Sequence, residues 1–373
     1  MYDRSQSKKK EKARFRILQI STMLLLAVLC MISILPSVRG DYVTEPQTMG
    51  VNYGQVANNL PSGADAVNLI KNLGAGRVKI YDTDAGTLKA LANSGLEVVV
   101  GMSNDEIPSL ATSAEVADQW IVTNVVAYVP ATNITVILVG NELFADPTNS
   151  NIWPQLVPAI QNLQTSLTTH GLASSIKLST ACEFSILTNS YPPSAVLTDG
   201  QFGYTNLLEA QLDAIYYAME ALGFKNVRIA LSESGWPTAG GIGANISNAQ
   251  AYNGNLVKYI LSGQGTPKRP QVFVPTYVFA LFNEDMKPGA PTEQHWGVLY
   301  PNGSAVYPFS LTTGLSSSPG SPNFPSPGSP DSSTNGSGEL DPPGGTSHYA
   351  CGDRPSVLPL SFTFLGSMFN LRI

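Results

Sequence analysis

The chain has 373 residues, of which 43% are hydrophobic and 13% charged, enough apolar material for one large globular core with appendages. Its net charge is −6, but 8 of its 21 basic and only 2 of its 27 acidic residues lie in the first 40, so the remainder carries 13 basic against 25 acidic side chains, a net charge of −12. Such acidity argues against nucleic acid as a partner and suits a neutral, hydroxyl-rich ligand.

Residues 1–40 have the pattern of a secretory signal peptide. Basic residues between Arg4 and Arg16 precede the apolar run Ile17–Leu35, and Val38–Gly40 offers small residues for cleavage. We expect cleavage near Gly40, although the run is also long enough for an uncleaved signal anchor. Either reading sends the body of the chain into the secretory pathway, where four sequons are available for N-glycosylation, at Asn133, Asn245, Asn302 and Asn335.

Cysteine and histidine are too sparse for a disulfide framework or a metal centre. The three cysteines are Cys30, Cys182 and Cys351, and we expect Cys182 to be a small buried hydrophobe. The three histidines are scattered, and His170 precedes Gly171 at an expected helix end.

Apolar strands alternate with amphipathic helices through residues 41–311. Apolar runs predict seven buried strands, at Met49–Tyr53, Arg77–Tyr81, Leu96–Gly101, Ile134–Val139, Ile176–Thr180, Val227–Leu231 and Val272–Ala280. Helical periodicity marks Ala66–Leu73 and Leu208–Leu222, each closed by a glycine, and Ser247–Gln250 is a capping-box pattern. Alternation predicts a parallel α/β sheet, and the number of units favours a TIM-type (β/α)8 barrel over an open sheet.

One helix and one strand of an eightfold barrel are missing from this pattern. Between Thr180 and Asn206 the sequence contains the loop signature Tyr191–Ser194 but no clear helix or strand. We therefore expect an incomplete or distorted barrel with about seven recognisable strands and a distorted or open wall at the gap, unless a replacement segment fills it. Leu178 and Ile229, on the flanking strands, should be less well covered than their counterparts elsewhere, and Ser194–Thr198 is the local segment that could fill the gap.

The composition changes after Leu311. Residues 312–355 are rich in Ser, Pro and Gly, which predicts an extended linker. Residues 356–373 are apolar again, but they are interrupted and too short for a secure membrane span. A polar spacer followed by an apolar tail is also the pattern of a GPI-attachment signal, with candidate sites at Gly344, Gly345 or Ser347. Free secretion into the extracellular space or cell wall and GPI anchoring at the outer face of the plasma membrane both stay open.

Two glutamates stand where expected strands end. Glu142 closes the string Val-Gly-Asn-Glu after one apolar run, and Glu233 lies in Ser-Glu-Ser-Gly-Trp-Pro after another. Since the carboxyl ends of parallel strands meet at one edge, these carboxylates can face each other across a cleft. Such a pair suits glycoside hydrolysis, in which one group protonates the leaving oxygen and the other attacks or activates water.

The chain resembles the family 17 glycoside hydrolases, the plant endo-β-1,3-glucanases. Five strings carry the resemblance in order: Met49–Gly54, Arg77–Tyr81, Val139–Glu142, Ser232–Pro237 and Phe282–Lys287. The resemblance implies an eightfold barrel, retention of configuration and no cofactor, with Glu142 as acid/base and Glu233 as nucleophile. A retaining mechanism needs the two carboxyl groups about 5–5.5 Å apart. The absent unit is the family's sixth helix–strand unit, which would also supply an aromatic part of the groove wall.

Other residues are candidates for binding the glucan. The resemblance implies that Asn141 bonds the sugar 2-hydroxyl and that Glu284, Lys287 and Glu293 form a supporting network, although a solvated charged loop is the alternative reading. Aromatic residues at strand ends can stack on sugars or fill the core. The candidates for ligand contact at these ends are Tyr53, Tyr81 and Phe282, whereas we expect Trp236 to pack structurally.

Two functions follow as hypotheses. The first is a monomeric, secreted or surface-anchored hydrolase that cleaves callose-like or fungal-wall β-1,3-glucan internally. The second is a catalytically weak or inactive glucan-binding wall protein descended from that enzyme. Both glutamates favour the first hypothesis, and the missing unit favours the second.

Overall fold

The computed structural model describes residues 47–183, 197–199, 202–314 and 361–365. The strands are β1 (Gly50–Tyr53), β2 (Arg77–Ile80), β3 (Glu97–Gly101), β4 (Ile134–Asn141), β5 (Lys177–Glu183), β6 (Leu197–Asp199), β7 (Phe202–Tyr204), β8 (Arg228–Ser234), β9 (Thr276–Val278) and β10 (Ser361–Leu365). The α-helices are α2 (Gly63–Asn72), α3 (Ala85–Ala90), α4 (Ile107–Thr112), α5 (Ala114–Ile121), α6 (Leu156–Thr169), α7 (Leu207–Ala221) and α8 (Ile246–Leu261). Short turns are the π-helical η2 (Val122–Val126) and the 3₁₀ segments η1 (Asn104–Glu106), η3 (Pro147–Asn151), η4 (Trp153–Gln155) and η6 (Pro291–Gln294).

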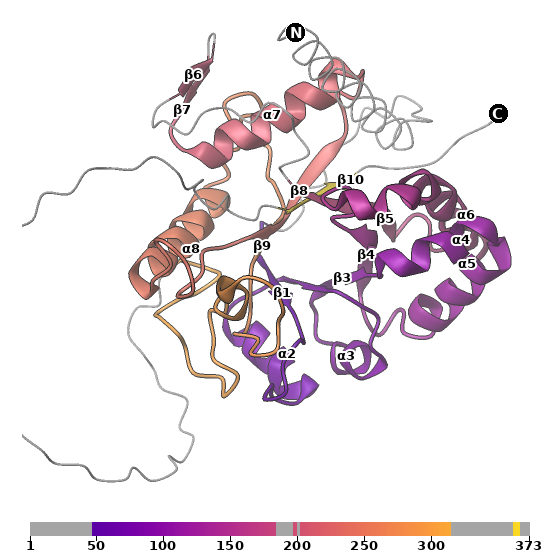
Figure 1. Cartoon of the computed structure of the whole chain (residues 1–373), viewed down its shortest axis with the longest axis horizontal. Coiled ribbons are helices and arrows are strands. Elements are labelled where there is room, and N and C mark those ends of the chain that lie inside the picture. Colours follow the sequence, from indigo (N-terminus) through magenta and orange to yellow (C-terminus); the bar gives the residue numbers. More distant parts are fainter. Residues whose placement is uncertain (1–46, 184–196, 200–201, 315–360, 366–373) are drawn as a thin grey trace, which may run out of the picture.

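The strands close into a barrel in the order β1-β2-β3-β4-β5-β10-β8-β9. Each of the seven predicted strands is present, and their mutual pairings are parallel. In Figure 1 the helices lie around the outside of these strands. The predicted α/β barrel with seven recognisable parallel strands is therefore confirmed.

The wall at the gap is not open, so that alternative of the prediction is wrong. Strand β10, from the C-terminal tail, lies between β5 and β8 and pairs antiparallel with both. Leu178 and Ile229, on the two flanking strands, are each only 1% exposed, so the expectation of poorer cover is also wrong. The candidate filler Ser194–Thr198 lies partly outside the described residues. Its last residues belong to β6, which forms a separate two-stranded hairpin with β7.

One predicted strand is much shorter than its apolar run. The run Val272–Ala280 contains Pro275, which has no N–H for a strand ladder and restricts the residue before it. Strand β9 accordingly begins only at Thr276. The Pro275 carbonyl still accepts a hydrogen bond from Leu231 N of β8 (2.8 Å).

Helix boundaries follow local capping chemistry. Helix α2 begins after Ser62, whose side chain accepts from Asp65 N, and ends near Gly74, where φ is +82°. Helix α6 ends at Thr169 with His170 as its C-cap, followed by Gly171 in the left-handed region, so the predicted capping role of His170 is confirmed. The predicted capping box at Ser247–Gln250 is wrong, because Asn245 is the N-cap and accepts from Asn248 N.

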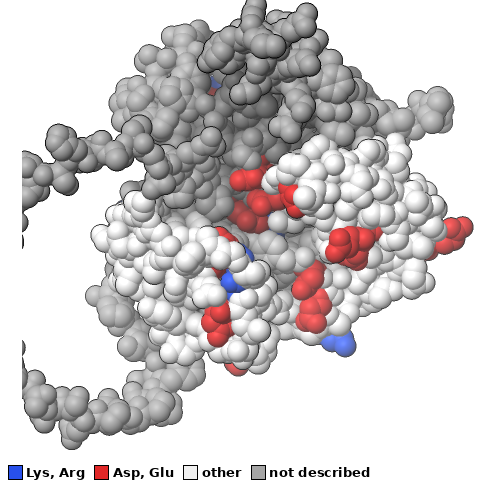
Figure 2. Space-filling model, in the orientation of Figure 1, with Lys and Arg blue, Asp and Glu red and all other residues white. Residues whose placement is uncertain are grey.

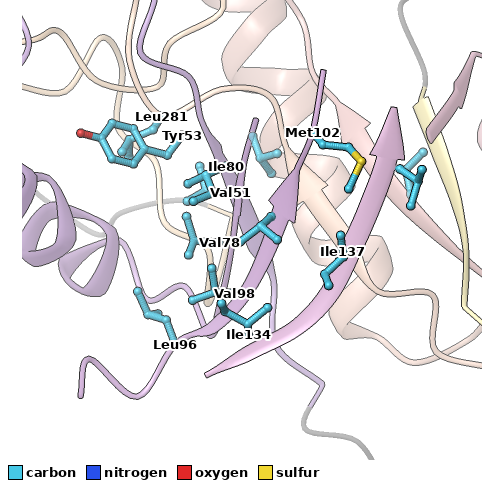
Figure 3. Packing of buried hydrophobic residues seen from close by; sticks show 14 of the residues in the cluster. Val51, Tyr53, Val78, Ile80, Leu96, Val98, Met102, Ile134, Ile137 and Leu281 are labelled. Atoms are coloured by element: carbon cyan, nitrogen blue, oxygen red, sulfur yellow. The ribbon is translucent and has the colours of Figure 1, made fainter. Parts of the chain in front are cut away.

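The strands bury both of their faces. One face packs against the helices in the main hydrophobic cluster, which includes Val51 of β1, Val78 of β2, Val98 of β3 and both Ile134 and Ile137 of β4 (Figure 3). The alternate residues form a second, smaller cluster in the barrel interior, made of Val99, Val136, Leu138, Ala181 and Tyr277. The interior is packed closely enough that a Cβ on Gly50 would overlap the Tyr277 ring.

None of the helices in the described residues is long and apolar enough to cross a membrane. The predicted signal peptide, and the predicted linker beyond Gly314, lie outside the described residues. Of the apolar tail 356–373, the structure describes only Ser361–Leu365.

Candidate active site

Glu142 and Glu233 both lie at carboxyl ends of parallel barrel strands. Glu142 directly follows β4, and Glu233 is the penultimate residue of β8. In the barrel order β4 and β8 are separated by β5 and β10. The surface in Figure 2 is hollowed at its centre, and Asp and Glu side chains gather around the hollow, whereas few Lys and Arg side chains are visible.

Glu233 is a buried carboxylate with two donors on one oxygen. The residue is 8% exposed. Lys79 Nζ, on β2, forms an ion pair with Glu233 Oε1, and the Tyr81 hydroxyl donates to the same oxygen (3.0 Å). Lys79 Nζ also lies 4.6 Å from the centre of the Tyr81 ring. Burial and the neighbouring Glu233 raise the pKa of Tyr81 well above its usual value, so this phenol stays a proton donor.

Asn52, on β1, makes hydrogen bonds to residues of β8 and of the segment that follows β2, close to the Glu233 carboxylate. Its Nδ2 donates to the Tyr81 hydroxyl (3.1 Å) and to the Ser232 carbonyl (3.0 Å), so β1 holds both β2 and β8. Asn52 and Lys79 lie inside two of the strings that carry the family resemblance but were not predicted as site residues. The alternation of Arg77 and Lys79 with Val78 and Ile80 was the available signal, since it places the charged side chains on the barrel's inner face.

The backbone that carries Glu142 is irregular. The register between β4 and β5 shifts between Leu138 and Asn141, and Glu142 has φ +46°, a left-handed conformation that is uncommon outside glycine. Asn104 stabilises the turn: Asn141 N donates to its Oδ1 (2.8 Å), and its Nδ2 donates to the Asn141 carbonyl (3.0 Å). Glu142 N donates to the Ala181 carbonyl (3.1 Å). A strained residue held by its surroundings is a common feature of functional sites.

Cys182 on β5 lies within electrostatic range of Glu142. Burial, followed by the charge of Glu142, raises the pKa of the Cys182 thiol to about 12. The thiol is thus neutral and behaves as a small hydrophobe, as predicted.

Glu284 is a second buried carboxylate at the same end of the barrel, whereas Glu142 is half-buried. It is 4% exposed, and its Oε1 accepts a hydrogen bond from Val56 N (2.8 Å). A Cβ on Gly54 would overlap the Glu284 carboxylate, so glycine is required for this close approach. Burial is the main reason that the pKa of Glu284 is raised. The charges of Glu293 and Glu233 also raise it, whereas the Val56 N–H and Lys287 lower it.

Lys287 links the rest of the predicted supporting network. Its Nζ forms an ion pair with Glu293 Oε2 (3.2 Å) and lies 4.2 Å from the centre of the Phe279 ring. Its backbone N donates to the Glu284 carbonyl (3.2 Å). The three charged residues therefore form one connected cluster, and Glu284 is its member within electrostatic range of Glu233.

The predicted aromatic contacts occupy different environments. Tyr81 bonds the Glu233 carboxylate, whereas Tyr53 is 2% exposed and packs edge-on against Phe282, itself 1% exposed (ring centres 6.0 Å apart). Trp236 packs against Tyr252 (5.7 Å), and its Nε1 donates to the Gly243 carbonyl. The structure thus places Tyr81 beside the carboxylate, and Tyr53 and Phe282 within the core.

Within the described part of the chain, no three His, Cys, Asp or Glu side chains are grouped so as to hold a metal ion. The arrangement instead provides one carboxylate held by a cation and a phenol, one carboxylate on a strained turn, and one buried carboxylate of raised pKa. Carboxyl groups that share a site but differ in surroundings can take different roles in catalysis.

Comparison with known proteins identifies the relatives of this chain. The model of the glycosyl hydrolases family 17 matches residues 49–202 and 195–311. Glucan endo-1,3-beta-glucosidase 11 of Arabidopsis thaliana is 37% identical over 324 residues, which cover 71% of this chain and 76% of the relative. Glucan endo-1,3-beta-D-glucosidase of Olea europaea is 33% identical over 369 residues, which cover 82% and 79%.

Solved structures give the same picture. A beta-1,3-glucanase and allergen of Cryptomeria japonica pollen superposes with a TM-score of 0.69 at 37% identity, covering 73% of this chain and all of that one. A plant beta-glucan endohydrolase superposes with a TM-score of 0.62 at 31% identity, covering 70% and 99%. The two segments matched by the family model meet at residues 195–202, inside the stretch where the sequence lacks a helix–strand unit.

Proposed function

The chain belongs to glycosyl hydrolase family 17, and from this premise we propose that it is a retaining endo-β-1,3-glucan hydrolase with Glu233 as nucleophile and Glu142 as acid/base. Its named relatives are glucan endo-1,3-beta-glucosidases, which supports β-1,3-glucan as the substrate class. The single observation that carries the assignment of roles is the environment of Glu233.

A nucleophile must be ionised and firmly oriented. Lys79 supplies a buried positive charge against Glu233 Oε1, and Tyr81 donates to the same oxygen. Both contacts bind the carboxylate and fix its plane. We assign the attack on the anomeric carbon to the other oxygen, Oε2.

The acid/base must give up a proton and later take one back. Glu142 stands on a turn that Asn104 fixes from the neighbouring strand end, at the same end of the barrel as Glu233. In the first step Glu142 protonates the leaving glucan oxygen while Glu233 forms the glycosyl ester. In the second step Glu142 removes a proton from water, which attacks the ester and restores Glu233.

The second candidate function, a weak or non-catalytic glucan-binding wall protein, is favoured by the helix–strand unit that the sequence lacks between Thr180 and Asn206. A test of full-length protein on laminarin separates the two functions. The enzyme releases reducing ends and shortens the polymer early, as internal cleavage requires, and Glu233→Gln abolishes release without abolishing binding. Laminarin binding by the wild type without release of reducing ends would instead support the binding protein.

For location we propose a secreted, N-glycosylated monomer of the extracellular space or cell wall. The signal pattern of residues 1–40 supports secretion, and the three sequon asparagines in the described residues, Asn133, Asn245 and Asn302, are all exposed. Digestion of the secreted protein with an N-glycosidase should lower its apparent mass. GPI anchoring stays the alternative, and a phospholipase that releases the protein from membranes would favour it.

A further inference from the structure

The C-terminal tail contributes a strand to the barrel wall. Strand β10 lies between β5 and β8, where a further parallel strand would otherwise stand. Its pairs on β5 are Ser361 with Glu183, Phe362 with Cys182 and Thr363 with Ala181. Its pairs on β8 are Ser361 with Glu233, Phe362 with Leu231, Thr363 with Ala230, Phe364 with Ile229 and Leu365 with Arg228. One five-residue segment thus pairs with residues 181–183 of β5 and with residues 228–231 and 233 of β8.

The sequence of this segment fits the two faces of the wall. Positions 362 and 364 stand opposite Cys182, Leu231 and Ile229, which belong to the helix-facing hydrophobic cluster. Position 363 stands opposite Ala181, which belongs to the interior cluster. The alternation Ser-Phe-Thr-Phe-Leu therefore has its two phenylalanines at register positions opposite outer-face residues and Thr363 at a position opposite an inner-face residue.

We propose that Ser361–Leu365 is a resident barrel strand that replaces the missing unit within the same molecule, and that it positions the nucleophile from the neighbouring strand. Open edges of β5 and β8 would leave backbone N–H and C=O groups unpaired inside the wall, and β10 provides partners for both. Its first residue stands opposite Glu233, at a point where the register on β8 shifts. The effect on the nucleophile rests on the proposed function, whereas closure of the barrel does not.

The connection back to the barrel is long enough for closure in cis. Residues 315–360 join Gly314 to Ser361, and a chain of that length can span on the order of 150 Å when extended. Cleavage at Gly344, Gly345 or Ser347 for GPI attachment would remove β10. The proposal therefore requires that the mature protein keep its tail.

Disulfide trapping in the full-length chain tests the register directly. Residues opposite each other in an antiparallel pair have Cα atoms about 4.5–5.5 Å apart, within the range of a disulfide. In a Cys30→Ser, Cys351→Ser background, Phe362→Cys should form a bond with Cys182 on mild oxidation. Thr363→Cys is the matched control, because the neighbouring position lies on the other face of the strand and should not react with Cys182.

A second pair tests the other edge. Ala230→Cys with Thr363→Cys, in a background that also carries Cys182→Ser, should form a disulfide between β8 and the tail. Peptide mapping by mass spectrometry identifies each bond, and a non-reducing gel shows whether it lies within one chain. Absence of either bond, equal trapping in the control, or bonds only between two chains would overturn the proposal.

Two truncations separate closure from catalysis. A chain ending at Leu365 keeps β10 and should retain the wild-type Tm, whereas a chain ending at Leu360 lacks it and should have a lower Tm or fail to fold. A wild-type Tm for the shorter chain would overturn the proposal whether or not the protein hydrolyses glucan. If the disulfides form but the wild type shows no activity on laminarin, barrel closure stands and the proposed function fails.

Discussion

Replacement of Lys79 by Met tests whether the Lys79–Glu233 pair is a coupled, buried interaction. The Lys79 side chain is 1% exposed and that of Glu233 is 10% exposed, so neither group can recover full hydration when its partner is removed. Methionine has a similar length and keeps the packing of the stem. Tyr81 would still donate a hydrogen bond to the Glu233 carboxylate, which would have lost its cationic partner.

The expected loss of stability follows from this burial. Removal of one partner of a buried ion pair costs about 3–5 kcal/mol, and we expect the lower end, about 3 kcal/mol, because of the Tyr81 hydrogen bond. For a domain of this size that corresponds to a fall in Tm of about 6–12 °C. In a Glu233→Gln background Lys79→Met should instead raise the free energy of unfolding, because it removes a buried charge that has lost its partner.

Urea denaturation of the four proteins of this double-mutant cycle measures the coupling. Lys79→Met should destabilise the wild type and stabilise Glu233→Gln, and Lys79→Arg, which keeps the charge, should cost less than Lys79→Met. Equal destabilisation by Lys79→Met in both backgrounds would refute the reasoning, since Lys79 would then act by packing alone.

Three further outcomes are expected. Glu233→Ala should abolish turnover and be rescued by azide with formation of a glycosyl azide of inverted configuration, whereas Glu142→Ala should still cleave substrates with good leaving groups, as product analysis and kinetics will show; equal, unrescued loss in both variants contradicts these roles. Asn104→Ala removes two hydrogen bonds to Asn141 and should lower the free energy of unfolding by about 2 kcal/mol in urea titrations, and an unchanged value means that the turn needs no clamp. Burial raises the pKa of the Glu284 carboxyl, so its contribution to stability is complete below about pH 4.5 and is lost as pH rises through the pKa of the folded protein. Glu284→Gln should therefore match the stability of the wild type near pH 4 and exceed it at pH 7, as urea titrations at the two pH values will show. The opposite pH trend would be inconsistent with burial as the cause.

Strand positions were predictable because buried parallel strands are continuous apolar runs. The run at Ile134 predicted β4, although the structure extends it to Asn141 through an irregular register that no apolar pattern encodes. The apolar run that begins at Val272 predicted too long a strand for β9. Pro275 lacks the N–H that a strand ladder needs, and hydrophobicity alone does not reveal this.

The site was predictable where a motif marks a strand end, and less so inside the strands. Glu142 and Glu233 follow apolar runs directly, so their common edge could be inferred. Lys79 and Asn52 were missed because they lie within strands, where a polar residue facing the barrel interior looks like an ordinary interruption of the pattern. Only the fold shows that both side chains reach the Glu233 network.

Closure of the barrel could not be predicted from local sequence. Strand β10 lies far along the chain from β5 and β8, and its five residues resemble many short β-prone segments. Its partner edges are created by what is absent between Thr180 and Asn206. Only the folded barrel brings the apolar tail and these two edges together.

Covalent trapping tests the central claim, that Glu233 is the nucleophile of a retaining β-1,3-glucan hydrolase, most directly. A 2-deoxy-2-fluoro laminari-oligosaccharide with a good leaving group should form a glycosyl ester that turns over slowly enough for proteolysis and mass spectrometry. We predict that the added mass of the sugar lies on the peptide that contains Glu233, and that Glu233→Gln takes up no label. A label on the Glu142 peptide, or hydrolysis with no trapped ester and an inverted product, would contradict the account.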